Sequence, residues 1–335
     1  MSISILNKKI GDDFPTFIVA EAGLNHNGDI NIAKKMIDAA IDTGVDAIKF
    51  QTFKTEEFLA KSSQYFELFK NVELSFNDFE ELNEYAKEKN CIFFSAPFDL
   101  ISTDFLIKID VPCFKIASSD LTNIPLIKKI AKTKKPMIIS TGLSNLQEVE
   151  ETIGHCKNEN NDQLILLHSI SNYPTNPYET NLNAMKTLKE KFEVAVGYSD
   201  NGESSLVDLV AVGMGANLIE KHFTLDKKME GPDHSFSIEP NDLKELISDI
   251  RLIEKMKGNG TKTPQGSEIP AIKAIRKSLT ARKNISKGDT LSLENIAIKR
   301  PQEGIEPKFL EKILGKTVIR DILIDMPIKF EDLAE

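Results

Sequence analysis

The sequence predicts an α/β protein: a TIM (β/α)8 barrel followed by a small β-rich domain. Two observations carry this prediction. First, eight short apolar runs rich in β-branched residues alternate with amphipathic stretches of helical period through residues 1–258. Second, several runs end abruptly in charged or amide side chains, as in segments 17–28 and 47–52. Buried parallel strands end in this way where their C-terminal tips open into a site, and eight strand–helix units need about 250 residues.

The eight expected strands follow one another at intervals that leave room for one helix and two short loops. We place them at residues 17–21, 45–50, 91–95, 112–116, 136–140, 164–168, 194–198 and 216–221. Apolar residues recur every three or four positions in segments 31–43 and 143–156, which predicts helices that cover the sheet. Segment 241–257 has the same pattern and completes the ring, so the barrel is expected to span residues 1–258.

The pattern changes after residue 258. Segment 257–268 is dense in turn-forming residues and has no apolar period, so we expect residues 259–276 to form a linker. Short alternating runs then resume at 278–282, 296–299 and 317–321. They predict a β-rich domain over residues 277–335, which at about 60 residues lies near the lower size limit for independent folding.

Composition excludes several classes of function. The 335 residues carry a net charge of −9 without a basic face interleaved with aromatic residues, which argues against a nucleic-acid partner. No apolar run approaches the ~20 residues that span a bilayer, and the N-terminus lacks the order of a signal peptide. The three cysteines have no metal-like spacing. We therefore expect a cytoplasmic protein without a membrane partner.

Three lysines mark the tips of expected strands, namely Lys49, Lys115 and Lys221. Cations gathered at one mouth of an acidic protein indicate an anionic small-molecule substrate. Lys49 and Gln51 alternate with apolar residues, so both point to one side of their strand. That side is either the barrel interior or the outer helix layer, where a lysine would extend its ammonium group to solvent.

Hydroxyl groups follow two neighbouring strands. Segment 114–120 ends in a lysine, two serines and an aspartate, and segment 139–142 contains a serine, a threonine and a glycine. Hydroxyl donors, an open backbone and a lysine are the groups that bind phosphate. Each hydroxyl alone is equally explained as a helix cap. Their coincidence on two adjacent strands favours a phosphate site at Lys115, Ser118 and Ser140.

Four histidines lie near strand ends. His26, His168 and His222 lie at or beyond the first, sixth and eighth strands, and His234 lies in the following loop. A single histidine at a strand end is more often a hydrogen-bonded structural residue than a ligand. His222 is the stronger candidate because segment 231–235 after it is rich in oxygen and nitrogen donors. No compact metal motif occurs, so any metal would be held by separate strand tips and water.

The barrel motifs, taken together and in order, resemble the sialic acid synthase family. They are 17–28, 48–52, 95–98, 114–118, 140–142, 173–175, 197–200, 220–224 and 231–235. Residues 299–301, Gly304 and 314–316 look like the antifreeze-like (SAF-type) domain at the C-terminus of that family. The segments that begin at Glu21 and Gly231 look closer to bacterial legionaminate-type members.

The resemblance implies a reaction. The family condenses phosphoenolpyruvate with an N-acylated amino-hexose, either N-acetylmannosamine or a 2,4-diacetamido-trideoxyhexose, to give a nine-carbon 2-keto sugar acid and phosphate. By matching position, it implies that the residues that bind phosphoenolpyruvate are Lys49, Lys115, Ser118 and Ser140, with Ser171 or Asn172 and with Ser199 nearby.

The resemblance also implies catalytic roles. Glu21 and Gln51 would orient reacting groups, and Tyr173 and Asp233 would contact the sugar. Either Glu21 or Asp120 would activate the water that attacks carbon 2 of phosphoenolpyruvate, with Lys115 as the third catalytic residue. Asp120 stands where relatives usually have Glu.

A divalent cation, manganese or magnesium, is implied at the aldehyde oxygen of the open-chain sugar. Relatives usually read Ser-Asp-His where this chain reads Ser199-Asp200-Asn201. The implied ligands are therefore His222 and Asn201, with an amide in place of one imidazole. An amide oxygen suits a hard cation.

Partners and alternatives follow from the same residues. The resemblance implies a homodimer with exchanged C-terminal domains, in which Arg300 lies over the sugar of the other subunit. A Schiff-base aldolase on the same barrel would instead use Lys115 or Lys221 as its nucleophile. A carbohydrate-binding relative without catalysis would have lost its metal site at Asn201.

Overall fold

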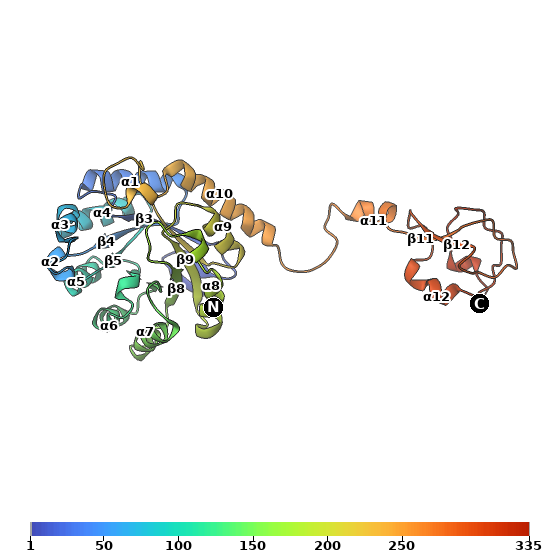
Figure 1. Ribbon diagram of the computed structural model, residues 1–335, viewed down its shortest axis with the longest axis horizontal. Coiled ribbons are helices and arrows are strands. Elements are labelled where there is room, and N and C mark those ends of the chain that lie inside the picture. The colour runs from blue at the N-terminus through green and yellow to red at the C-terminus, as the bar shows by residue number, and fades with distance from the viewer. Residues whose placement is uncertain (1, 335) are drawn as a thin grey trace. The chain divides into compact units, whose positions relative to one another are not determined.

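A closed barrel of eight parallel strands forms the larger part of the molecule (Figure 1). The structure is a computed structural model that describes residues 2–334. The strands lie in the order β10-β3-β4-β5-β6-β7-β8-β9, and β10 pairs with β3 to close the ring. Their bounds are β3 (Phe17–Gly23), β4 (Ala47–Thr52), β5 (Ile92–Pro97), β6 (Phe114–Ile116), β7 (Met137–Ser140), β8 (Leu164–Ser169), β9 (Ala195–Asp200) and β10 (Leu218–His222). The TIM-barrel prediction is confirmed.

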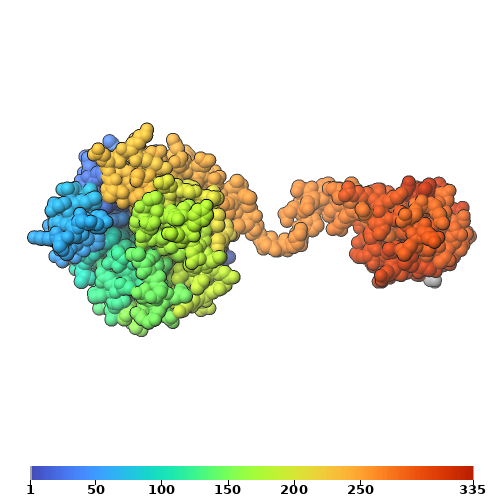
Figure 2. Space-filling view, in the orientation of Figure 1, coloured from blue at the N-terminus to red at the C-terminus, as the bar shows by residue number. Residues whose placement is uncertain are grey.

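Eight main helices surround the strands (Figure 1), and the colours of the barrel unit run in sequence order from blue through green to orange (Figure 2). Polar caps mark several starts: Asp29 accepts from Asn31 N–H before α1, and Asn145 begins α7 with a capping box. No helix within residues 2–334 is both long and apolar enough to cross a membrane. The helices are α1 (Ile30–Thr43), α4 (Phe76–Glu88), α5 (Leu100–Lys108), α6 (Ile124–Ala131), α7 (Leu146–Asn158), α8 (Asn183–Phe192), α9 (Leu206–Gly213) and α10 (Pro240–Lys257).

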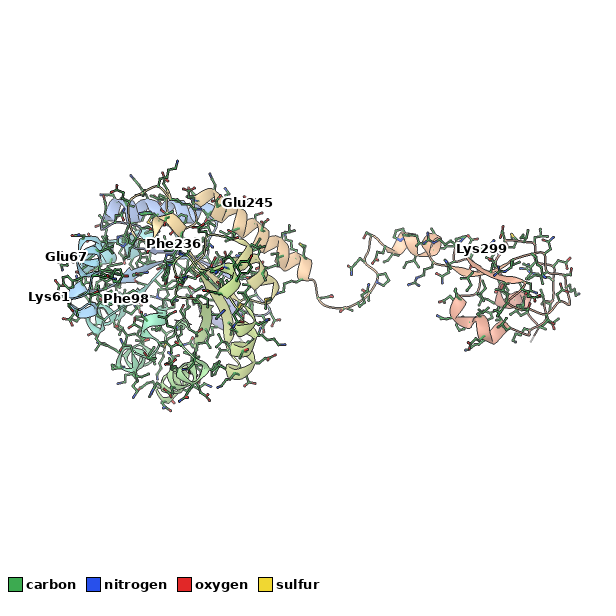
Figure 3. All side chains as sticks on the ribbon, in the orientation of Figure 1. Lys61, Glu67, Phe98, Phe236, Glu245 and Lys299 are labelled. Atoms are coloured by element: carbon green, nitrogen blue, oxygen red, sulfur yellow. The ribbon has the colours of Figure 1, made fainter. Side chains whose placement is uncertain are left out.

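Two short helices, α2 (Thr55–Phe58) and α3 (Phe66–Val72), are inserted between β4 and α4. Four aromatic rings attach this insertion to the barrel, with ring centroids between 4.9 and 6.3 Å apart: those of Phe53, Phe58, Phe69 and Phe98. Lys61 and Glu67 lie on the same side of the barrel unit as Phe98 (Figure 3). The insertion therefore brings aromatic side chains to the mouth of the barrel beside β4 and β5.

The barrel has two apolar layers. Outward-facing strand residues pack against the helices, and inward-facing residues fill the end opposite to the strand tips. An N-terminal hairpin of β1 (Ser2–Ile5) and β2 (Lys8–Gly11) joins the inner layer through Ile3, Ile5 and Ile10. The sequence analysis did not anticipate this hairpin, because two strands of four residues are too short to show a clear period.

The chain divides into two compact units, Met1–Gly258 and Asn259–Glu335. The second unit has an apolar core that includes Leu279, Ile296 and Ile328, and it forms the small β-rich domain. Its elements are α11 (Ile269–Ile275), β11 (Ser278–Ala281), β12 (Ile296–Lys299) and α12 (Leu310–Ile313), and β11 pairs with β12 antiparallel.

Two details of this unit differ from expectation. A helix, α11, forms inside the segment 259–276 that we expected to be a plain linker. The alternating run at 317–321 forms single bridges rather than a strand, Thr317 with Thr290 and Val318 with Leu333. Val318 is the buried residue of this run, so the run contributes one side chain to the core of the unit rather than a continuous ladder.

Candidate active site

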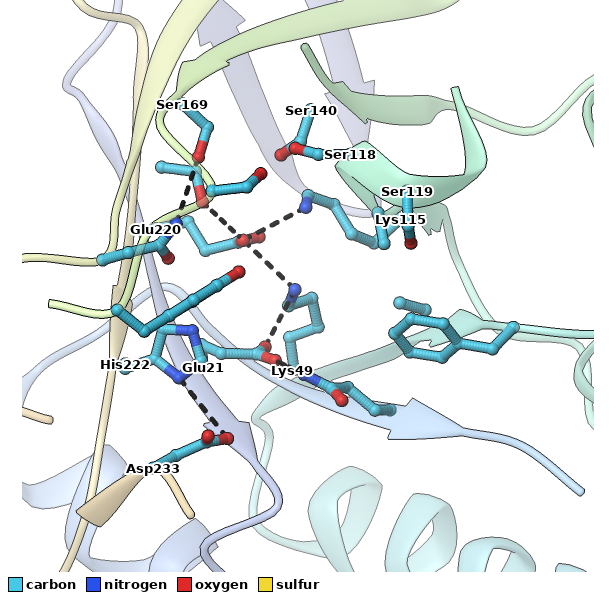
Figure 4. A pocket seen from close by; sticks show the side chains of 18 of the residues that line it. Glu21, Lys49, Lys115, Ser118, Ser119, Ser140, Ser169, Glu220, His222 and Asp233 are labelled. Carbon is cyan, nitrogen blue, oxygen red and sulfur yellow. Dashed lines mark hydrogen bonds and ion pairs between the residues drawn. The ribbon is translucent and has the colours of Figure 1, made fainter. Parts of the chain in front are cut away.

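The C-terminal ends of the barrel strands surround a cavity of about 370 Å³, shown from close by in Figure 4. Each strand directs every second side chain into the barrel, and this alternation builds the wall. The predicted site residues that line the cavity are Glu21, Lys49, Gln51, Lys115, Ser118, Ser140, Ser171, Tyr173, Ser199, Asn201, His222 and Asp233. Lining residues that sequence reasoning did not select include Leu24, Phe69, Phe98, Leu143 and Glu220.

Four charged side chains form a buried network in the middle of the cavity (Figure 4). Lys49 Nζ lies 2.9 Å from Glu21 Oε2 and 3.1 Å from Glu220 Oε1. The same Glu220 oxygen lies 3.1 Å from Lys115 Nζ and accepts a hydrogen bond from Ser199 Oγ at 3.0 Å. No charged side chain of this network is more than 5% exposed. Two carboxylates and two ammonium groups thus compensate one another, as buried charges require.

This network sets the protonation states of its members. Burial lowers the pKa of Lys115 to about 8, and attraction to Glu220 limits the fall. Burial raises the pKa of Glu220, but the charges of Lys115 and Lys49 outweigh that effect and bring the pKa to about 2. Burial also raises the pKa of Glu21, against the attraction of Lys49. Glu220 is therefore a fixed anion near neutral pH, whereas Glu21 is better able to exchange a proton.

Hydroxyl groups gather beside Lys115. Ser118 Oγ accepts a hydrogen bond from the Gly142 N–H at 3.0 Å. A side chain at Gly142 would be blocked, because its Cβ would lie 2.7 Å from Ser118 Oγ and 2.5 Å from Ser171 Oγ. Ser140 Oγ is buried and has no hydrogen-bond partner within residues 2–334, and it points toward the same side as Ser118 (Figure 4). Converging hydroxyls, an open backbone and an ammonium group suit an oxyanion.

The opposite side of the cavity carries an imidazole and a carboxylate (Figure 4). His222 Nδ1 lies 4.0 Å from Asp233 Oδ2, is buried, and has no hydrogen-bond partner in the described chain. The His222 ring centroid lies 5.8 Å from that of Tyr173 and 5.1 Å from that of Phe236. Burial lowers the pKa of His222 and raises the pKa of Asp233. The imidazole is therefore neutral near pH 7 and offers a lone pair to a ligand.

The expectation that Lys221 joins the other strand-tip lysines at the mouth is wrong. Lys221 lies between Glu220 and His222 on β10, and because those two side chains face the cavity, the strand period turns Lys221 outward. Its ammonium group pairs with Asp200 and lies 3.2 Å from Asp208 of α9. Glu220 takes an inward position instead, and its two-residue spacing from His222 is the signal that could have identified it.

Three other predicted residues do not line the cavity. The buried Asp120 carboxylate accepts hydrogen bonds from Ser119 Oγ at 3.2 Å and from Asn123 Nδ2 at 2.9 Å. Asn172 is exposed, and Arg300 belongs to the C-terminal unit. Asp120 is thus held by neighbours in its own loop, and the roles of all three remain predictions.

The remaining strand-end histidines are structural. His26 Nδ1 accepts from Gly28 N–H at 3.1 Å, and burial together with His234 lowers the pKa of His26 to about 4. His168 Nε2 donates to the Thr180 carbonyl at 2.7 Å. His234 Nδ1 lies 2.6 Å from Thr224 Oγ1. His234 thus ties the loop that carries Asp233 to Thr224, whereas His26 and His168 bind backbone groups of other loops.

Comparison with known proteins identifies the family. Residues 36–262 match the model of the NeuB family, and residues 276–334 match that of the SAF domain. The chain belongs to the NeuB family. The resemblance to sialic acid synthases is thereby confirmed, and the C-terminal unit is a SAF domain.

Three similar proteins extend this NeuB-family assignment over the whole chain. An uncharacterized protein of Methanocaldococcus jannaschii is 51% identical, over 99% of this chain and 98% of that one. N,N'-diacetyllegionaminic acid synthase of Campylobacter jejuni is 44% identical, over 94% of this chain and 99% of that one. A crystal structure of N-acetylneuraminic acid synthetase from Leptospira borgpetersenii in complex with citrate is 40% identical with a TM-score of 0.78, covering 81% of this chain and 95% of that one. The latter two proteins are named as a synthase and a synthetase of sialic-acid-type sugars, so the chain belongs to a family of biosynthetic enzymes.

Proposed function

We propose that this enzyme condenses phosphoenolpyruvate with an N-acylated amino-hexose to give a nine-carbon 2-keto sugar acid and phosphate. The observation that carries the proposal is the division of one cavity into an oxyanion side at Lys115 and an imidazole–carboxylate side at His222, with Glu21 between them. This division matches a reaction that joins an anionic enol to an aldehyde.

The oxyanion side would hold phosphoenolpyruvate. Lys49 and Lys115 supply positive charge, and Ser118, Ser140 and Ser171 supply hydroxyl donors for the phosphate and carboxylate oxygens. Ser199 is hydrogen-bonded to Glu220, so we assign it to ordering the lysines as well as to lining the pocket. The exposed Asn172 is the weaker of the two candidates at its position.

We propose the following sequence of steps. Carbon 3 of phosphoenolpyruvate forms a bond to the sugar aldehyde carbon, whose oxygen takes a proton and becomes a hydroxyl. Water adds to the cationic carbon 2 and loses a proton, and the resulting intermediate releases phosphate by carbon–oxygen cleavage. A divalent cation, when bound, would polarise the aldehyde oxygen as a Lewis acid.

Glu21 is the proposed acceptor of the proton from water. It lines the cavity, Gln51 Nε2 donates to its Oε1 at 2.9 Å, and its pKa is raised by burial. Asp120 is the alternative that the resemblance allowed, but its carboxylate is bound by Ser119 and Asn123 outside the cavity wall. Geometry and protonation therefore both support Glu21.

For the acceptor we propose a 2,4-diacetamido-trideoxyhexose, the legionaminate-type substrate. The outer wall contains Leu24, Phe69, Phe98 and Leu143, which suit methyl groups better than charge. Lys49 and Lys115 are the lysines among the described residues that line the cavity, and both are assigned to phosphoenolpyruvate, which leaves no lysine for a second phosphate group on the hexose. The relative from Campylobacter jejuni is named for the corresponding product. N-acetylmannosamine is the alternative.

The decisive test is a phosphate-release assay with phosphoenolpyruvate and a panel of hexoses in the presence of manganese or magnesium. We expect release with the 2,4-diacetamido-trideoxyhexose, together with a nine-carbon acid detected by mass spectrometry. No release with any hexose of the panel would overturn the proposal.

Borohydride reduction in the presence of pyruvate separates this proposal from a Schiff-base aldolase. We expect no covalent adduct at Lys115, because its ammonium group is engaged by Glu220. Lys221 is unsuited as a nucleophile since it is buried against two aspartates outside the cavity. A reduced adduct on Lys115 would favour the aldolase.

A further inference from the structure

The proposed function requires a divalent cation. The cavity contains one small space, beside Gly23, that a potential nitrogen ligand and a potential oxygen ligand both face. Gly23, at the end of β3, lies against both groups of the imidazole–carboxylate side. A Cβ there would lie 2.8 Å from Asp233 Oδ2 and 3.3 Å from His222 Nδ1. The backbone φ of +52° also favours glycine. The absence of a side chain therefore keeps open a small space that both the nitrogen and the oxygen face.

The two facing atoms are suited to share a cation. The His222 nitrogen is buried without a hydrogen-bond partner in the described chain, and at 4.0 Å it is too far from Asp233 Oδ2 for a hydrogen bond. Two metal–ligand bonds of about 2.0–2.2 Å each can bridge a separation of this size. Asp233 Oδ2 also accepts a long hydrogen bond, 3.3 Å, from the Leu24 N–H, which orients the carboxylate.

Asn201 has a different set of contacts. Its Nδ2 donates to the Ile170 carbonyl at 2.8 Å, and because a carbonyl can only accept, the amide nitrogen must face that way. The backbone carbonyl of Asn201 accepts from the Thr175 N–H at 3.0 Å. Asn201 therefore joins the end of β9 to the loop that carries Ser171 and Tyr173.

We propose that Asp233 and His222 are the protein ligands of the divalent cation, in the space that Gly23 leaves open, and that Asn201 positions the 170–175 loop. This inference rests on the proposed function for its cation. Within residues 2–334 no third His, Cys, Asp or Glu completes the group, so water or sugar oxygens fill the remaining positions. The carboxylate and the water or sugar oxygens suit manganese or magnesium, and the imidazole favours manganese of the two.

The test measures manganese binding to the full-length, chelator-stripped protein without substrates, by the electron paramagnetic resonance signal of free Mn²⁺. We expect one ion per chain, a loss of affinity of at least about tenfold in Asp233→Asn and in His222→Asn, and a change of less than about threefold in Asn201→Ala. The thermal shift that Mn²⁺ produces in the wild type should vanish in Asp233→Asn and persist in Asn201→Ala. Unfolding midpoints without metal control for misfolding.

The outcomes separate this inference from the proposed function. Wild-type affinity in Asp233→Asn, or an equal loss in Asn201→Ala, would overturn the ligand assignment even if the wild type released phosphate from phosphoenolpyruvate. An absence of manganese binding to the wild type would overturn it as well. The expected binding pattern in a protein that releases no phosphate would support the cation site and refute the condensation.

Discussion

The two sides of the cavity differ in how their ionisable groups are paired. On the oxyanion side, Lys49 and Lys115 share Glu220 Oε1, while Glu220 Oε2 and the Ser140 hydroxyl have no hydrogen-bond partner in the described chain. On the other side, His222 Nδ1 faces Asp233 across 4.0 Å with no hydrogen bond to fill the gap. Charges that are compensated without substrate give a preorganised anion site, whereas an unpaired nitrogen beside a carboxylate indicates a site completed by a ligand.

The largest expected effect lies between the two sides. Replacing Glu21 by Gln removes the proposed proton acceptor, so kcat should fall roughly 10²- to 10⁴-fold with little change in the KM for either substrate. Steady-state kinetics by phosphate release would measure this. Asp120→Asn is the matched control and should stay within a few-fold of wild type. If Asp120→Asn shows the larger loss, the base has been assigned to the wrong carboxylate.

The variant Lys115→Met tests whether the oxyanion side binds phosphoenolpyruvate independently of hexose binding on the other side. Losing a charge-assisted contact to a buried anion costs roughly 1.5–3 kcal/mol, so affinity for phosphoenolpyruvate should fall about tenfold to a hundredfold. The KM for the hexose should change little. Lys129→Met, on α6 where the lysine pairs with Asp104, serves as the control and should leave both values near wild type. Equal losses for both substrates would mean that the sides are not independent.

A pH series tests the same lysine without mutation. The pKa of Lys115 is lowered to about 8. Its side-chain amine is therefore mostly protonated at pH 7 and loses its proton, and with it the positive charge, as the pH rises through 8. The kcat/KM for phosphoenolpyruvate should therefore fall about tenfold between pH 7 and pH 9, since that ratio reports the free enzyme. The KM for the hexose should stay nearly flat. A flat profile for phosphoenolpyruvate up to pH 9 would show that this ammonium group does not hold the substrate.

The smallest expected signal concerns the proposed dimer. We expect Arg300 to act on the sugar bound in the partner's barrel, because its planar guanidinium suits hydroxyl and acyl oxygens. Mixing Arg300→Ala subunits with Lys115→Met subunits should then restore about a quarter of the sites if subunits exchange at random. Activity of the mixture against each variant alone measures this. Mixtures that never exceed the sum of the separate variants would place Arg300 in its own subunit's site or outside it.

Several features of this protein were determined by local sequence alone. The eight strands and the segments of the main helices follow from the pattern of apolar residues. Strands buried on both faces are apolar throughout, and in amphipathic helices apolar residues recur every three or four positions. The sequence also predicted Lys49 and Lys115 at the site, but the same rule failed for Lys221, so a lysine near a strand end does not by itself fix the side that it faces. The predictions that hold depend on the pattern of apolar residues within a single strand or helix.

Only the tertiary structure determined which side each side chain faces and which residues distant in the sequence lie close together. Glu220 and Lys221 are adjacent in the sequence, and only the orientation of β10 in the closed barrel turned the carboxylate inward and the ammonium group toward α9. Asp120 sits in the right segment, yet a local turn binds its carboxylate to Asn123. The meeting of Asp233 with His222 across an open Gly23 joins β3, β10 and a loop. Such contacts depend on strand register and loop path, which are set by the packing of the whole barrel rather than by the residues beside them.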